Sequence, residues 1–112
     1  MIASLIEDHR KIEAALDRFA ESLDPADVKD LLTRHNLREE EFLNRLQTHE
    51  PGLAAKLRAQ HEEALELAAA LEASADTRDV PYLARRFVAI IQHNIIEEER
   101  DVFPLAARIL TA

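Results

Sequence analysis

The sequence predicts an all-α protein, an up-down-up-down four-helix bundle with a short C-terminal extension. Ala, Leu, Glu and Arg are prominent in the 112-residue chain, and these residues are strong helix formers. The single Gly and the four Pro leave little material for turns. Apolar residues recur at helical spacing along four stretches of roughly 20 residues. Such helices bury their apolar stripes by packing together, so we expect one domain over residues 1–112.

The first two helices are bounded by local signals. We expect the first over residues 4–22, because Ser4-Leu-Ile-Glu7 has the pattern of a capping box. We expect the second over residues 25–48, because Asp24-Pro25 resembles an N-cap followed by Pro at the first helical position. Short connections of this kind favour antiparallel neighbours.

The last two helices are separated by a polar loop. We expect the third over residues 51–74, after the break at Glu50-Pro51-Gly52, and the fourth over residues 80–103. Pro104 should end or kink the fourth helix, because Pro lacks an N–H and clashes with the preceding turn. Residues 105–110 then predict a short tail helix.

Each helix carries a histidine on its apolar stripe, and the second and fourth also carry a glutamate one turn later. Residues four apart share one helix face, so each His-x-x-x-Glu pair points its two side chains the same way. Counted from the predicted helix ends at 1.5 Å per residue, these side chains fall at one level of the bundle. The six candidate metal ligands are His9, His35, Glu39, His61, His93 and Glu97.

Imidazole and carboxylate ligands together suit iron or manganese, and also zinc. The histidines of the first two helices would serve one metal ion and those of the last two the other, with Glu39 and Glu97 as bridges. Open positions would take water, an oxo or hydroxo bridge, or a small ligand such as dioxygen. His49 lies at a helix end and is left out of the site. The remaining nearby glutamates are expected to be solvated: Glu40, Glu41, Glu62, Glu63, Glu98 and Glu99.

Composition excludes several other classes of function. With 14 basic and 22 acidic residues the net charge is −8, and no basic stripe is present, so we expect no nucleic-acid partner. Acidic lipid surfaces are disfavoured for the same reason. The chain has no Cys, which excludes zinc–thiolate and iron–sulfur sites. No apolar run is long enough for a membrane span, and the first residues lack the pattern of a signal peptide. We therefore expect a cytoplasmic protein without a membrane partner.

Taken together, these motifs resemble the hemerythrin-like, or HHE cation-binding, domain over nearly the whole chain. The resemblance implies a four-helix bundle that holds a non-heme centre of two oxo- or hydroxo-bridged iron ions, with manganese or zinc as alternatives. Such a centre would bind or react with dioxygen or a related small molecule. The motifs that carry the resemblance are His9, His35-Asn-Leu-Arg-Glu39-Glu40, His61-Glu62, His93-Asn-Ile-Ile-Glu97 and Val102-Phe103-Pro104.

Two departures from the family pattern bear on function. Oxygen-carrying hemerythrins have a second histidine one turn after the first in the third helix, and this chain has Leu65 there. Their fourth-helix carboxylate lies five residues after the histidine, whereas Glu97 lies four after His93 and Glu98 lies five after it. We expect Glu97 to be the bridge. The overall pattern is similar to that of hemerythrin-like domains used for sensing or for peroxide and nitric oxide chemistry, rather than for reversible oxygen transport.

Three functional hypotheses follow. The first is a non-heme di-iron protein that binds or senses dioxygen, nitric oxide or iron. The second is an enzyme in which the same centre acts on hydrogen peroxide or nitric oxide. This is the less expected of the two, because the sequence shows no dedicated proton donor and Tyr82 lies far from the level of the histidines. The third is a structural or interaction bundle without metal, in which the inward polar residues pair with one another.

Overall fold

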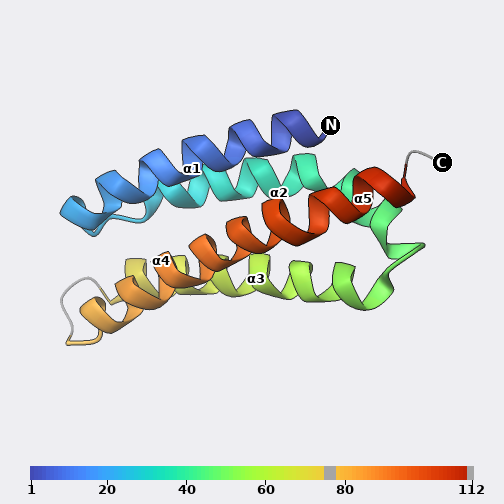
Figure 1. Ribbon diagram of the computed structural model, residues 1–112. Helices are drawn as coiled ribbons and strands as arrows, with labels where there is room; N and C mark the ends of the chain where they lie inside the picture. Colours follow the sequence, from blue (N-terminus) through green and yellow to red (C-terminus); the bar gives the residue numbers. More distant parts are fainter. Residues whose placement is uncertain (75–77, 111–112) are drawn as a thin grey trace.

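The computed structural model describes residues 1–74 and 78–110, and they form a helical bundle. Neighbouring helices run antiparallel, and the N-terminus and α5 lie at the same end of a molecule that measures 51 × 24 × 20 Å (Figure 1). The predicted up-down-up-down four-helix bundle with a short C-terminal extension is confirmed. The elements are α1 (Ile2–Ser22), α2 (Ala26–Gln47), α3 (Pro51–Ala73), α4 (Val80–Glu97), a π-helical turn η1 (Glu98–Val102) and α5 (Phe103–Ile109).

The ends of α1 and α2 differ slightly from the sequence prediction. Helix α1 begins at Ile2, and the Ser4 hydroxyl donates to the Met1 carbonyl at 2.9 Å. Ser4 therefore lies inside the helix, and the predicted capping box is wrong. Helix α2 begins at Ala26, whose N–H donates to Asp24 Oδ1 at 3.0 Å. Asp24 thus satisfies one of the free amides at the start of the helix, but the N-cap is Pro25, which was predicted to be the first helical residue.

The predicted break at Pro104 is replaced by a continuous helical path through η1. The Phe103 N–H donates to the Glu98 carbonyl, five residues back, so this turn is wider than an α-helical turn. Pro104 then lies in the first turn of α5, the part of a helix in which proline is best tolerated. The wide turn keeps both Glu98 and Val102 fully buried.

Two apolar clusters fill the bundle, one toward each end. In the first, the rings of Phe19 and Phe87 meet edge-on with centroids 5.2 Å apart. In the second, the rings of Phe42 and Phe103 do the same at 5.5 Å. Between these clusters lies a layer of buried polar side chains, which are His9, His35, Glu39, His61 and Glu98.

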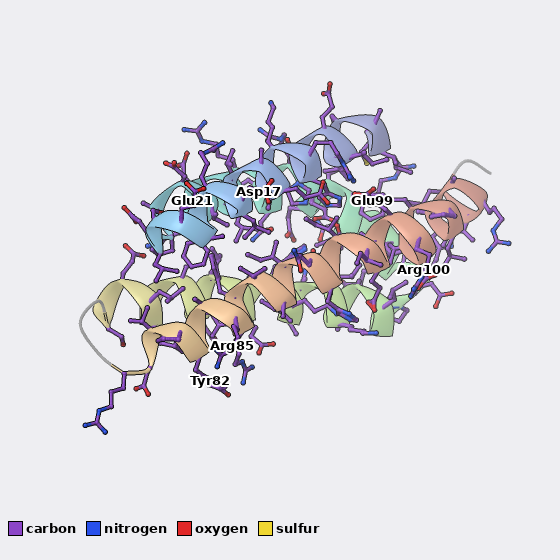
Figure 2. The ribbon with its side chains drawn as sticks, turned by 60° about the vertical axis from the view of Figure 1, so that its left-hand side comes forward. Asp17, Glu21, Tyr82, Arg85, Glu99 and Arg100 are labelled. Atoms are coloured by element: carbon purple, nitrogen blue, oxygen red, sulfur yellow. The ribbon has the colours of Figure 1, made fainter. Side chains whose placement is uncertain are left out.

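Charged side chains cover the outside of the bundle. Figure 2 shows Asp17 and Glu21 on the outer surface of α1, and Arg85 and Tyr82 projecting outward from the first turns of α4. Tyr82 is 53% exposed, which leaves it remote from the buried polar layer. Within the described ranges, no helix combines the length and apolar character that a membrane crossing needs.

Candidate metal centre

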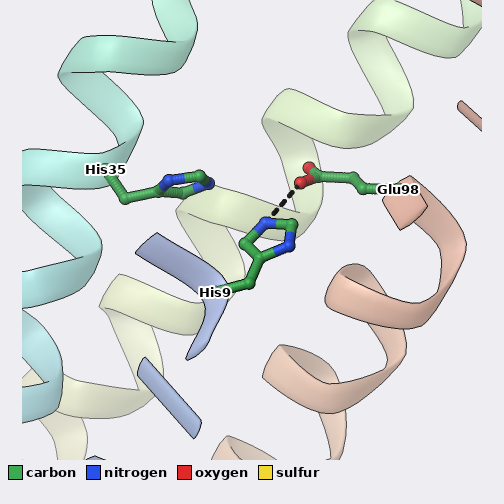
Figure 3. A group of neighbouring side chains, drawn as sticks. All are labelled: His9, His35 and Glu98. Atoms are coloured by element: carbon green, nitrogen blue, oxygen red, sulfur yellow. Dashed lines mark hydrogen bonds and ion pairs between the residues drawn. The ribbon is translucent and has the colours of Figure 1, made fainter. Parts of the chain in front are cut away.

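Five buried side chains from α1, α2, α3 and η1 form a closed ring across the bundle. Glu98 joins two of its histidines, since Oε1 accepts from His9 Nε2 at 2.9 Å and Oε2 accepts from His61 Nε2 at 3.1 Å. Glu39 Oε2 lies 3.4 Å from His61 Nε2 and 2.9 Å from His35 Nε2. The imidazoles of His35 and His9, with centroids 4.9 Å apart, close the ring. Figure 3 shows His9, His35 and Glu98 converging from three sides.

Each ring member takes the place of an apolar residue on the inward stripe of its helix. His9 lies between Leu5 and Ile12, both of which are buried in the apolar clusters on either side. His35 and Glu39 are one turn apart on α2 and point the same way, as their spacing predicts. The regular period of a helix therefore places all three side chains in the core without any special backbone feature.

His93 lies outside the ring, and its predicted place at the centre is wrong. Its side chain is 62% exposed. The inward stripe of α4 starts from the fully buried Phe87, and steps of 3.6 residues from there lead to Asn94 and Glu98. His93 is rotated by about 100° from Asn94 and so reaches the surface. Glu98, which was expected to be solvated, is the fourth-helix carboxylate that the ring contains.

Glu97 also lies outside the ring and belongs to a separate polar chain between α3 and α4. Lys56 Nζ donates to Glu97 Oε2 at 3.0 Å, and Gln60 Nε2 donates to Glu97 Oε1 at 3.5 Å. Further inside, Asn94 Nδ2 donates to Gln60 Oε1 at 2.7 Å. His93 Nε2 lies 3.6 Å from Glu97 Oε2 at the surface. Since the Lys56 ammonium already supplies a cation to this carboxylate, the expected bridging role of Glu97 does not fit its position.

Two carboxylates outside the ring hold the imidazoles of His9 and His35 in place. His9 Nδ1 donates to Glu99 Oε2 at 2.7 Å, and His35 Nδ1 donates to Asp8 Oδ2 at 3.0 Å. Arg38 donates two hydrogen bonds to the Asp8 carboxylate, from Nε to Oδ2 at 2.9 Å and from Nη2 to Oδ1 at 2.5 Å. Both imidazoles consequently turn Nε2 toward the centre. Carboxylates orient metal-binding histidines in the same way.

Sequence reasoning missed three of these residues, and signals for two of them are visible in the chain. Glu98 follows from the helical period once Phe87 is taken as the start of the inward stripe. Asp8 directly precedes His9, and it is 6% exposed on a helix whose other outward positions are solvated. Glu99 lies in η1, so its approach to His9 depends on a π turn that no sequence pattern here indicates.

The ring concentrates opposing charges in a desolvated layer. Burial raises the pKa of Glu39, and the nearby Glu98 carboxylate raises it further. Burial by itself would also raise the pKa of Glu98, but hydrogen bonds from His61 and His9 lower it to about 2. Burial would lower the pKa of His61, yet its bond to Glu98 and the charge of Glu39 raise it. The raised pKa values of His9, His35 and His61 favour positively charged imidazoles beside the Glu98 carboxylate in the metal-free protein.

The donor set fits a metal-binding role. Glu39 is completely buried, and among the described residues its Oε1 has no hydrogen-bond partner, whereas its Oε2 has ion-pair contacts with His35 Nε2 at 2.9 Å and His61 Nε2 at 3.4 Å. Leaving a buried carboxylate without hydrogen bonds is costly, and a cation would offset that cost. The described residues contain two groups of three possible metal ligands. Within each group the ligand atoms lie within 4.8 Å of one another, and Glu98 belongs to both groups. One group is His9, His35 and Glu98, and the other is Glu39, His61 and Glu98.

The separations between ring atoms suit neighbouring ligands of one ion. Ligand atoms about 2.0–2.1 Å from a metal lie about 3 Å apart when they are at right angles. The atom pairs His9–Glu98, His61–Glu98 and His61–Glu39 are separated by 2.9, 3.1 and 3.4 Å.

Comparison of the chain with protein families, with curated proteins and with solved structures gave no match. The metal-centre hypothesis therefore depends on the geometry of these side chains.

Proposed function

We propose that this protein binds two non-heme metal ions, with iron as the preferred metal, and that the centre binds or senses a small molecule such as dioxygen or nitric oxide. One ion would be held by His9, His35 and Glu98, and the other by Glu39, His61 and Glu98. Glu98 would bridge the two, since its two oxygens face different histidines. Mixed nitrogen and oxygen ligation suits iron and manganese, and zinc is a further alternative.

The observation that carries the proposal is the environment of Glu39. Its carboxylate is fully buried, and Oε1 has no hydrogen-bond partner among the described residues, while Oε2 faces the Nε2 atoms of His35 and His61. A bundle whose inward polar residues only pair with one another would satisfy both oxygens, because a buried carboxylate oxygen without a hydrogen bond is unfavourable. A metal ion beside Glu39 and His61 supplies the missing positive charge. This favours the metal-binding hypothesis over the purely structural one.

The number of ligands supports the binding of a further small molecule. Each position has three protein ligands, the number that ligand-binding and catalytic zinc sites combine with an open position. A metal bound there would supply Lewis-acid and redox chemistry. The residues around it supply orientation, because Asp8 and Glu99 hold the two imidazoles of the first position.

The resemblance to hemerythrin-like domains is the basis for proposing two iron ions in particular. Glu98 lies five residues after His93, which is the spacing of the fourth-helix carboxylate in oxygen-carrying hemerythrins. The exposed position of His93 departs from that pattern, and Leu65 departs from it as well. Fewer imidazoles than in an oxygen carrier support sensing or small-molecule binding rather than reversible transport.

Metal analysis of the purified protein tests the proposal. We expect about two iron ions per chain after anaerobic addition of iron(II), and a change in the optical spectrum when nitric oxide is added to the iron(II)-loaded protein. Glu39→Gln and Glu98→Gln should each lose bound iron. Glu97→Gln is the matched control, since its carboxylate is paired with Lys56 and should leave iron content unchanged. Failure of the wild-type protein to take up iron, manganese or zinc would overturn the proposal.

A further inference from the structure

A surface groove between α2 and α3 leads to one side of the ring. It has a volume of about 180 Å³. Its wall includes Asn36 and His61, and these two residues also line a small, largely enclosed cavity inside the bundle. That cavity measures about 10 Å³, which is near the minimum that holds one water molecule. Asn36 and His61 thus form a shared wall between the groove and the cavity beside the ring.

The His61 side is the most accessible part of the ring. His61 is 9% exposed, whereas the other ring members are between 0 and 2% exposed. The metal position at His61 also has a single imidazole, since its other ligands would be Glu39 and Glu98. Leu65, one turn beyond His61, lines the groove and supplies no ligand. An exchangeable ligand would therefore bind the ion at His61 from the groove side.

Asn36 supplies a hydrogen-bond acceptor at the shared wall. Its Oδ1 atom is shielded from solvent and has no hydrogen-bond partner among the described residues. A shielded acceptor of this kind is stabilised by a ligand that donates a hydrogen bond. Water and hydrogen peroxide each carry an O–H group, whereas dioxygen and nitric oxide carry none. Much of the remaining cavity wall is apolar and is formed by Ile12, Leu32, Ala64, Ile91 and Ile95.

The charges around the groove disfavour anions. Arg58 donates to Glu40 at 3.0 Å, so these two charges balance each other. Arg58 is held further by Asn44 and Gln47, at 2.8 Å each, across the mouth of the groove. The carboxylate of Glu62 also lines the groove and adds a negative charge. A ligand such as azide or superoxide would be repelled, while an uncharged molecule would not.

On the basis of the metal centre proposed above, we propose that the groove between α2 and α3 admits a small uncharged oxygen ligand with an O–H group to the metal position at His61. Asn36 Oδ1 accepts the hydrogen bond of that ligand. Water is the resting occupant, and hydrogen peroxide is the reactive molecule of the same size and chemistry. Asn36 is thus a positioning residue for the ligand, and Leu65 lines the path that the ligand takes.

Water exchange on the manganese(II)-loaded protein tests this inference. Bound manganese is counted by the loss of the free-ion electron paramagnetic resonance signal, and exchange of its water is measured by oxygen-17 and proton relaxation. We expect Asn36→Leu to release the water about fivefold faster, as the loss of a hydrogen bond of about 1 kcal/mol predicts. Leu65→Phe should fill the groove and slow the exchange. Leu37→Phe, at an exposed position of α2, is the control and should match the wild type.

Nitric oxide provides the second arm, because it has no proton to donate. Because nitric oxide must displace the water that Asn36 holds, its affinity for the iron(II)-loaded protein, followed optically, should rise about fivefold in Asn36→Leu. Manganese binding with identical water exchange in all variants would overturn this inference and leave the metal centre standing. A nitric oxide affinity that is unchanged or lower in Asn36→Leu would overturn the acceptor role. Absence of manganese and iron binding would overturn the proposed function itself, and this inference with it.

Discussion

Replacing Glu98 by Gln should destabilise the metal-free protein by about 3 kcal/mol at pH 6. The carboxylate is completely buried and accepts hydrogen bonds from His9 at 2.9 Å and from His61 at 3.1 Å. Burial alone would raise its pKa, but these bonds lower the pKa from 4.5 to about 2. Each pKa unit corresponds to about 1.4 kcal/mol, so the difference corresponds to about 3 kcal/mol of stability. Gln keeps the volume of the side chain and removes its charge.

Urea denaturation of metal-free wild type, Glu98→Gln and Glu97→Gln measures this effect. A lowered pKa stabilises the folded state above pH 4.5, and the contribution disappears as the pH falls toward 2. The penalty of Glu98→Gln should therefore shrink over that range. Glu97→Gln breaks a half-exposed pair with Lys56 and should cost about 1 kcal/mol or less. Equal stability of Glu98→Gln and wild type at pH 6, or a penalty independent of pH, would refute the reasoning.

Three further predictions concern the metal itself. Removing bound metal with a chelator should lower the melting temperature by about 10 °C, because a ligand at 100 times its dissociation constant stabilises by about 2.7 kcal/mol. Identical calorimetric scans with and without chelator would contradict this. Asp8→Asn should weaken binding of zinc about 10- to 100-fold in competition with an indicator dye, and the exposed change His93→Ala should have no effect. The reverse order would reinstate His93 as a ligand. Metal affinity should rise from pH 6 to pH 8, because a metal ion must displace the protons of its imidazole ligands. Burial would lower the pKa values of His35 and His61, but their partner carboxylates raise them. Over the same range the metal-free protein should lose stability, since a raised pKa stabilises the folded state only below it. A pH-independent affinity in titration calorimetry would count against imidazole ligation.

Four of the predicted site residues lie together in the ring because they are on long, regular helices. His9 follows Leu5 and precedes Ile12 on one stripe, and both neighbours are buried. Once such a stripe is recognised, the period of 3.6 residues determines which side chains face inward. The same reasoning places His35, Glu39 and His61, and the structure brings them within hydrogen-bonding range of one another or of Glu98.

On the fourth helix the same periodicity led to a wrong prediction of which side chains face inward. His93 and Asn94 are adjacent, and the spacing of apolar residues locates the inward face of this helix only to within one residue, so it is compatible with either side chain facing inward. They differ by about 100° around the axis, and that rotation separates the core from solvent. Packing of Phe87 and Ile91 against the other helices buries Asn94 and Glu98 and exposes His93. Because sequence periodicity describes one helix at a time, it does not determine this rotation.

The sequence by itself determined the helical composition, the antiparallel order of four helices and a polar layer between two apolar ones. Local propensity and amphipathic spacing are sufficient for these features, because each is a property of a single helix or a short connection. The tertiary structure alone decided that Glu98 rather than Glu97 joins His9 and His61, and that the groove beside Asn36 reaches the centre. These features depend on how four helices rotate against one another and on the π turn at Glu98–Val102. They follow from packing between residues far apart in the chain, which no local pattern specifies.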